Sequence, residues 1–258
     1  MKVSANSALI KLTVLTAGGT GLLIRALLYA TATDAKGLLS RNHPLSILLT
    51  ALSIIVVAGI FLLTRPIHGP KKYEDCFHPS IPGGLGCMLA SAGILLTTIN
   101  ELSAPADPVS LLLRGAGFLA AACLLVAGAC RMMGSRGSFL FYAMASLYFC
   151  LRMVCQYRLW SDIPQLQDYA FQLLACMTLM LTAYHHAAFG ADMGRHKSLW
   201  FFGLTSVYLC CLCLAGPENQ LFFLGTGIWA LADLSNLTPR LRRQRPNLHL
   251  EEQDSEEV

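Results

Sequence analysis

Long, continuous apolar runs alternate with short polar connectors along almost the whole chain. The runs lie at about 8–30, 45–64, 84–102, 109–131, 138–160, 165–188, 198–215 and 219–237. Each is close to the ~20 residues that a helix needs to cross a hydrocarbon core. Strands of a membrane barrel would instead alternate apolar and polar residues. We therefore expect an all-α, polytopic transmembrane helix bundle with eight spans, forming one domain over residues 1–239.

The composition points to lipid as the main solvent. Hydrophobic residues make up 55% of the chain, charged residues only 13%, and the mean hydropathy is +0.54. An average soluble domain has about 25% charged residues. This excludes an ordinary cytosolic enzyme, a disordered protein and a nucleic-acid binder, so the expected partner is the lipid bilayer. All but one of the ten cysteines lie inside apolar runs, where we expect buried thiols and no disulfide framework.

The basic residues favour one orientation. With a cytoplasmic N-terminus, the inner segments carry most of the 19 Lys and Arg residues, namely Lys2, Lys11, Arg65, Lys71, Lys72, Arg131, Arg136, Arg195, Lys197, Arg240, Arg242, Arg243 and Arg245. The outer connectors carry only Lys36, Arg41 and Arg158. Positive residues favour the cytoplasmic side, so we expect a multi-pass protein of the cell membrane with both termini cytoplasmic. A cleavable signal peptide in the first run is the competing interpretation, but its length and Arg25 argue against that.

The two halves of the chain share a weak similarity. Arg25 is followed one turn later by Tyr29, and Arg152 is followed one turn later by Gln156. Duplicated halves of four spans would have the same orientation, as parallel repeats do. A 4+4 repeat and coincidence among leucine-rich helices explain this pattern equally well.

Ionisable residues inside spans are energetically costly, and they are the first candidates for a functional site. Three arginines lie about 7–12 Å below the predicted outer surface, at 1.5 Å per helical residue. Polar side chains occur at a similar depth on neighbouring spans. The predicted ligand-binding residues are Arg25, Arg114, Arg152, Gln156, Asp168 and Gln172. Arginine forks suit carboxylate or phosphate groups.

A structural role for these arginines is the alternative. Long arginine side chains at this depth can reach the interface. Arg152 with Asp168, and Arg114 with Glu101, could also neutralise each other between helices.

The predicted cytoplasmic side has fewer candidate groups. Tyr184, His185 and His186 are typical of an interfacial belt, and Asp233 is expected to be solvated or paired with the basic run 240–245. The charged tail, residues 240–258, is expected to be cytoplasmic and disordered.

The functional prediction is a transporter or binding protein for a small, anionic solute, which would occupy the arginine-lined pocket. A non-catalytic membrane partner or sensor subunit, working through a protein partner, is the second hypothesis. An intramembrane enzyme acting on a lipid, with His185 and Asp168 as first suspects, is the third. The chain has no metalloprotease, serine-hydrolase or P-loop motif, which argues against an enzyme. No cofactor or metal site is predicted.

Overall fold

The computed structural model describes residues 2–32, 43–67, 69–70, 73–103, 107–160, 166–216 and 218–237, apart from the side chains of 2–7, 32, 74–75, 160 and 166–168. Its helices are α1 (Lys2–Ala32), α2 (Pro44–Thr64), α3 (Tyr73–Cys76), α4 (Ile81–Glu101), α5 (Pro108–Met132), α6 (Phe139–Trp160), α7 (Leu166–Gly190), α8 (His196–Cys213) and α9 (Gln220–Asn236). All regular structure in these ranges is helical, as predicted. Eight long helices match the eight apolar runs, and six of them, α1, α2 and α4 to α7, are long and apolar enough to cross a membrane.

Local sequence signals explain where several helices begin. A proline stands in the first turn of α2, α4 and α5, where its missing N–H costs no helical hydrogen bond. The Ser80 hydroxyl caps α4 by accepting a hydrogen bond from the Gly83 N–H at 3.1 Å. Because of this cap, α4 begins three residues before the predicted start at residue 84. Helix α1 also begins earlier, at Lys2 rather than at residue 8.

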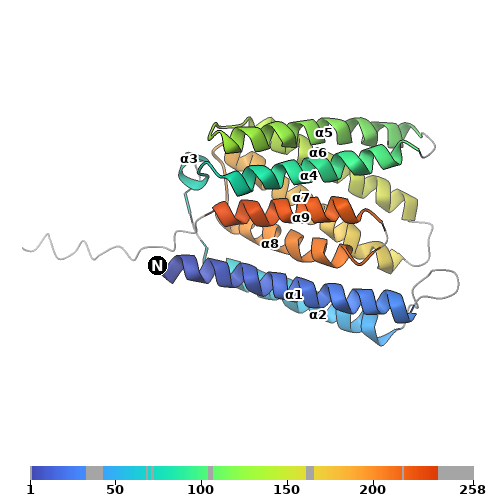
Figure 1. Cartoon of the computed structure of the whole chain (residues 1–258). Coiled ribbons are helices and arrows are strands. Elements are labelled where there is room, and N and C mark those ends of the chain that lie inside the picture. Colours follow the sequence, from blue (N-terminus) through green and yellow to red (C-terminus); the bar gives the residue numbers. More distant parts are fainter. Residues whose placement is uncertain are drawn as a thin grey trace, which may run out of the picture.

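Helices α4 to α9 pack together, and the α1–α2 pair lies against α8 (Figure 1). The most extensive interface joins α4 and α9. Glycines make this close packing possible: a Cβ at Gly225 would lie 2.5 Å from the Leu89 carbonyl oxygen, and one at Gly93 would lie 2.8 Å from that of Leu221. Small residues that bring helix backbones together are the usual device of membrane bundles.

One end of the bundle, here called the basic end, carries Arg65, Arg131, Arg136, Arg195 and Lys197. Three connectors meet there. The Tyr73 backbone N–H donates to Asp192 Oδ1 at 3.0 Å, and Arg136 Nη2 donates to the Gly190 carbonyl at 2.8 Å. Helix α1 begins and α9 ends at this same end (Figure 1). The eight long helices therefore form an up-and-down bundle. Its first helix begins, and its last helix ends, at the basic end.

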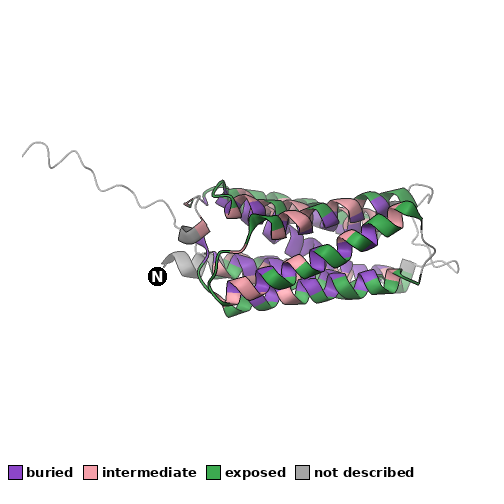
Figure 2. Ribbon diagram, turned by 90° about the horizontal axis from the view of Figure 1, so that it is seen from above, coloured by how far each residue is buried: buried purple, intermediate pink, exposed green. Residues whose placement is uncertain are grey.

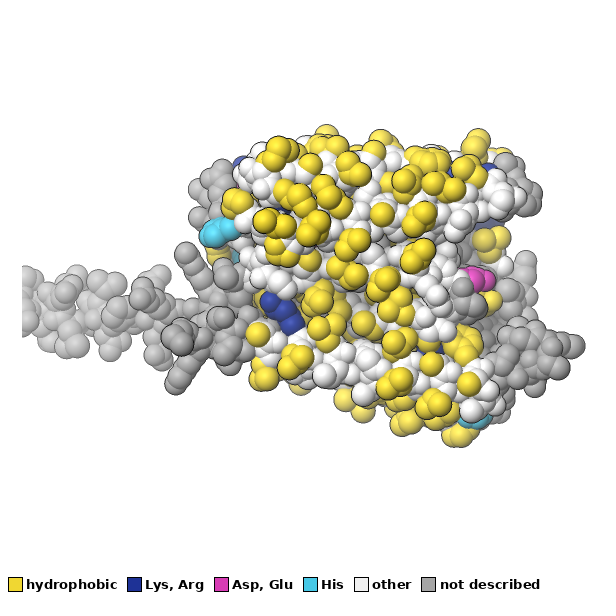
Figure 3. Space-filling view, viewed as in Figure 1, with side chains coloured by type: hydrophobic (Ala, Val, Ile, Leu, Met, Phe, Trp, Pro, Cys, Tyr) yellow, Lys and Arg dark blue, Asp and Glu magenta, His cyan; other side chains and the backbone are white. Residues whose placement is uncertain are grey.

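The bundle presents an apolar surface between its two ends. Buried positions face inward and exposed positions face outward along the helices (Figure 2). The exposed positions include large aliphatic side chains such as Ile47, Ile54 and Leu111, each at least 64% exposed. Figure 3 shows hydrophobic side chains spread over the visible face of the molecule. Water would not solvate such a surface favourably, so the bundle is membrane-embedded.

The packing does not confirm the possible 4+4 repeat. In such a repeat, α2 and α4 would pack as their counterparts α7 and α8 do. Helix α7 does lie along α8, whereas α2 packs on α1 and α8.

Candidate functional site

A cavity of about 390 Å³ opens at the end of the bundle opposite the basic end. It lies between the last residue of α4, the first turns of α5 and the second half of α6. Its lining residues are Glu101, Asp107, Val109, Ser110, Leu113, Arg114, Arg152, Cys155, Gln156, Arg158 and Leu159. We call it the arginine cavity. It contains three of the six predicted site residues, Arg114, Arg152 and Gln156.

Helical spacing explains how α5 and α6 supply its walls. Residues three and four apart share one helix face. Arg152, Cys155, Gln156 and Leu159 form such a row on α6, and all four line the cavity. On α5, Ser110, Leu113 and Arg114 form a matching row. The bundle turns these two rows toward each other.

Arg152 is the most constrained of these side chains. It is 1% exposed, and its Nη1 donates to Glu101 Oε1 and to the Tyr148 hydroxyl, each at 3.0 Å. Its guanidinium carbon also lies 4.6 Å from the centre of the Phe222 ring, within range of a cation–π contact. The side chain of Glu101 is 33% exposed. The cation is therefore fixed in the bundle, and its carboxylate partner stands toward solvent.

The lining has an excess of positive charge. Three arginines, Arg114, Arg152 and Arg158, face two acids, Glu101 and Asp107. Gln156 adds an amide, whose Oε1 accepts a hydrogen bond from Cys176 Sγ at 3.6 Å. This arrangement can neutralise and hydrogen-bond a small anion from two sides.

Two other predicted site residues lie in a different cluster, between α1, α7 and α8. Arg25 is 2% exposed, and its Nη1 donates to the Leu212 carbonyl at 2.9 Å. That carbonyl belongs to the last turn of α8. The last four carbonyls of a helix accept no hydrogen bond within it, and a nearby cation is favourable. Gln172 is also buried, and Phe171 beside it lies against the Arg25 guanidinium. The side chain of Asp168 lies outside the described residues.

A second ionic cluster lies buried near the basic end, and it corrects the expectation for Asp233. Asp233 is neither solvated nor left to the basic run beyond α9, because it is 0% exposed and pairs with Arg131 of α5. His186 of α7 is 3% exposed rather than part of an interfacial belt, and its Nε2 lies 3.1 Å from Asp233 Oδ2. Three helices thus contribute one ionisable group each to a sealed cluster.

Aromatic side chains close this cluster. Tyr142 stacks on His186 with ring centres 5.2 Å apart, and the Arg131 guanidinium lies 4.6 Å from the centre of the Phe77 ring. Phe77 follows α3, which sits across the basic end. Tyr73 of α3 stacks on Phe77, and burial raises the pKa of its hydroxyl, so this cover adds no charge. Packed side chains therefore cover this cluster, whereas the arginine cavity is open.

The prediction missed part of the cavity wall. Arg158, counted with the outer connectors, and Asp107, which falls between the predicted spans 84–102 and 109–131, both line the cavity. The row of residues three and four apart on α6 could have identified Cys155. Nothing in the residue pattern could have separated Arg25 from the other two arginines, because all three lie at similar depth. Among the described residues, no three His, Cys, Asp or Glu side chains converge as metal ligands would.

No protein-family model, curated protein or solved structure matches this chain. Its class is therefore defined by fold and surface: it is a membrane-embedded helical-bundle protein.

Proposed function

We propose that all eight long helices cross the membrane and that both chain ends face the cytoplasm. Helices α8 and α9, with 18 and 17 residues, are the shortest of the eight, at the lower end of what a span requires. They lie among the longer helices, where neighbouring protein replaces lipid along most of their length. The basic end then faces the cytoplasm, as the positive-inside rule favours. The arginine cavity opens to the outside.

We further propose that the protein binds a small anionic solute in the arginine cavity, as a transporter or a membrane-embedded binding protein. The observation that carries this proposal is the convergence of three arginines on one cavity of about 390 Å³. Ligand pockets are commonly about 300–1,000 Å³. Arginines inside a membrane protein are costly, and they are found where they pair or serve a ligand.

The geometry suggests how an anion would enter. Glu101 occupies one hydrogen-bonding position of Arg152 and is itself a third exposed. An incoming carboxylate or phosphate can replace Glu101 there without moving Arg152, which Tyr148 and Phe222 hold in place. Arg114 lies across the cavity on α5 and would complete the counter-charge. Gln156 would orient the ligand.

The other two hypotheses receive less support. A pure partner or sensor subunit would need its arginines paired away from any cavity, and Arg152 and Arg114 both line one. The enzyme hypothesis named His185 and Asp168, which stand 17 residues apart on α7, about 25 Å along the helix axis. His185 instead stacks on Phe202 with ring centres 5.5 Å apart.

The test is thermal unfolding of the purified protein in uncharged detergent, with phosphate and a panel of small carboxylates. A ligand that binds only the folded state raises the unfolding midpoint. At 100 times its Kd it adds about 2.7 kcal/mol to the free energy of unfolding. We expect at least one anion to stabilise the wild type and to lose this effect in Arg152→Gln. Arg136→Gln is the matched control, because it removes a cation at the other end and should respond as the wild type does. Stabilisation that is equal in Arg152→Gln, or absent throughout, would overturn the proposal.

A further inference from the structure

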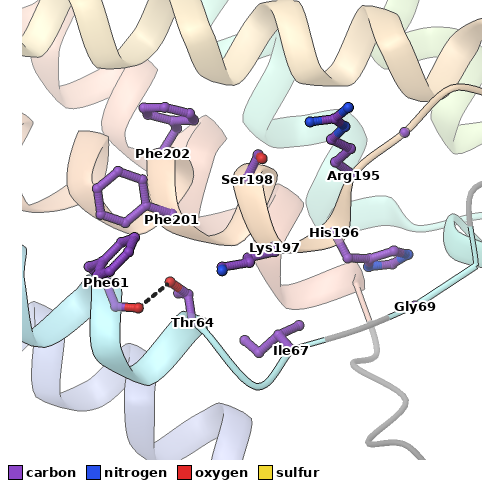
Figure 4. Close-up of a pocket in the computed structure, with 11 residues that line it drawn as sticks. Phe61, Thr64, Ile67, Gly69, Arg195, His196, Lys197, Ser198, Phe201 and Phe202 are labelled. Atoms are coloured by element: carbon purple, nitrogen blue, oxygen red, sulfur yellow. Dashed lines mark hydrogen bonds between the residues drawn. The ribbon is translucent and has the colours of Figure 1, made fainter.

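A second cavity, of about 550 Å³, lies at the basic end between the end of α2 and the start of α8 (Figure 4). Its lining residues are Phe61, Thr64, Ile67, Gly69, Gly194, Arg195, His196, Lys197, Ser198, Phe201 and Phe202. We call it the α2–α8 cavity. It shares no residue with the arginine cavity, and the proposed function makes no use of it.

The polar side of the α2–α8 cavity is positively charged. Arg195 and Lys197 are exposed cations, and the lining contains no acid. The arginine cavity differs in this respect, because two carboxylates stand among its arginines. The first turn of α8 also lies here, and its first amides, at residues 196–198, have no acceptor within the helix. Arg195, the N-cap residue, makes no side-chain capping bond. Charge and backbone donors thus favour an anion at the same place.

His196 gives a second, independent indication of a ligand. Its side chain is 4% exposed, and one ring nitrogen, Nε2, lies 3.1 Å from Cys76 Sγ. The other nitrogen, Nδ1, is buried and has no hydrogen-bond partner among the described residues. Gly69 permits this arrangement, because a Cβ there would lie 2.5 Å from the His196 ring. Because the Cys76 thiol donates to the Pro70 carbonyl at 3.2 Å, Nε2 is the protonated ring nitrogen and Nδ1 is an acceptor. A hydroxyl group of a bound molecule can satisfy this buried acceptor, whereas a phosphate oxygen cannot.

The other side of the α2–α8 cavity is aromatic, and Lys197 Nζ reaches its edge, 5.7 Å from the centre of the Phe61 ring. Figure 4 places Phe61, Phe201 and Phe202 together, away from Arg195 and His196. The rings of Phe61 and Phe201 meet edge to face with centres 5.8 Å apart. Phe61 is 48% exposed, and the next residue, Leu62, is 63% exposed. The aromatic wall therefore continues onto the apolar surface that faces lipid.

We propose that the α2–α8 cavity binds an anionic phospholipid from the leaflet at the basic end. The headgroup phosphate lies against Arg195, Lys197 and the start of α8, and the acyl chains run along the phenylalanines. A free phosphate would use only the polar side and would leave the aromatic wall empty. A zwitterionic lipid would bring a third cation next to Arg195 and Lys197. An anionic phospholipid fits both sides.

Native mass spectrometry of the full-length protein tests this with three probes: phosphatidylglycerol, phosphatidylcholine with the same acyl chains, and glycerol 3-phosphate. We expect phosphatidylglycerol to bind at least about tenfold more tightly than either of the others. The double variant Arg195→Gln/Lys197→Gln should lose this preference. Arg136→Gln, which removes another cation at the same end, should keep it, as should Arg152→Gln in the arginine cavity.

Three results would overturn the proposal. Equal binding of the two lipids would remove the role of charge. Binding of glycerol 3-phosphate as tight as that of phosphatidylglycerol would make the ligand a free phosphate. Unchanged binding in the double variant would move the lipid elsewhere, for instance to the basic run 240–245. Should the double variant fail to fold, Lys197→Gln alone decides, because its side chain is exposed.

Discussion

The bundle contains two ionic clusters of similar composition and opposite character. At the basic end, Arg131 and Asp233 are both buried, His186 lies beside them, and aromatic rings cover the group. At the other end, Arg152 is equally buried, but its partner Glu101 is a third exposed and borders a cavity. Burial of a charge alone therefore does not indicate a ligand site. What separates the two clusters is whether one partner can be replaced from solvent.

The largest expected effect comes from breaking the sealed cluster. Asp233→Asn keeps the shape of the side chain but leaves Arg131 buried without its counter-charge. Removing one partner of a buried ion pair typically costs about 3–5 kcal/mol. We expect a large fall in the thermal unfolding midpoint. The double change Arg131→Met/Asp233→Leu should recover most of the loss, because it removes both charges. A midpoint that stays at the wild-type value in Asp233→Asn would mean that this cluster is not structural.

Breaking the open cluster should cost less. Arg152→Gln leaves Glu101 without its partner, but that carboxylate is partly hydrated already. Hydrogen bonds to charged groups contribute about 1.5–3 kcal/mol, and we expect a loss in this range, smaller than that of Asp233→Asn. The same unfolding assay without added anion measures it. A greater loss in Arg152→Gln than in Asp233→Asn would reverse the comparison and assign the structural role to the open cluster.

A variant of Arg25 should change stability without changing anion binding. Its guanidinium lies at the end of α8, where a partly buried cation contributes up to about 2 kcal/mol. Arg25→Gln should therefore lower the free energy of unfolding by about 1–2 kcal/mol. It should leave anion binding unchanged. Anion titration of the variant by thermal shift checks both parts. Loss of anion binding in this variant would mean that Arg25 is a ligand-binding residue, as the sequence predicts.

The smallest effect belongs to the exposed pair of Arg136 and Asp192. Their side chains are 42% and 41% exposed, and the contact is 2.7 Å. Such surface pairs contribute at most about 1 kcal/mol. Arg136→Gln should shift the unfolding midpoint only slightly, and raising the salt concentration should shrink even this difference.

The helices could be predicted from the sequence because their signals are local. Continuous apolar runs, bounded by prolines and polar connectors, placed all eight long helices. The described basic residues of the predicted inner connectors also lie together at one end of the bundle. The largest misplacement was the start of α1, which continues back to Lys2 through residues too polar to belong to the apolar run.

For the candidate site, the sequence could predict only how deep each polar residue lies in the bundle. Position along the chain gives the height of Arg25, Arg114 and Arg152 in the bundle, but rotation of each helix and choice of neighbour decide which of them meet. Helix α1 packs on α8, so Arg25 reaches the end of α8 and not the cavity. Asp233 was misjudged for the same reason. Helix α9 lies in the interior against α4 and α8, so its last turn is buried beside Arg131 instead of facing water.

Glu101→Gln tests the central claim most directly. If Glu101 competes with an anion for Arg152, neutralising it should tighten binding of the anion found in the thermal-shift panel, by about tenfold for a gain of 1.4 kcal/mol. The measurement is the anion's Kd in Glu101→Gln and in wild type, from midpoints over a range of anion concentrations. Our account predicts tighter binding in Glu101→Gln, whatever happens to stability without the anion. Equal or weaker binding in Glu101→Gln would contradict it, and Arg152 with Glu101 would then be a structural pair.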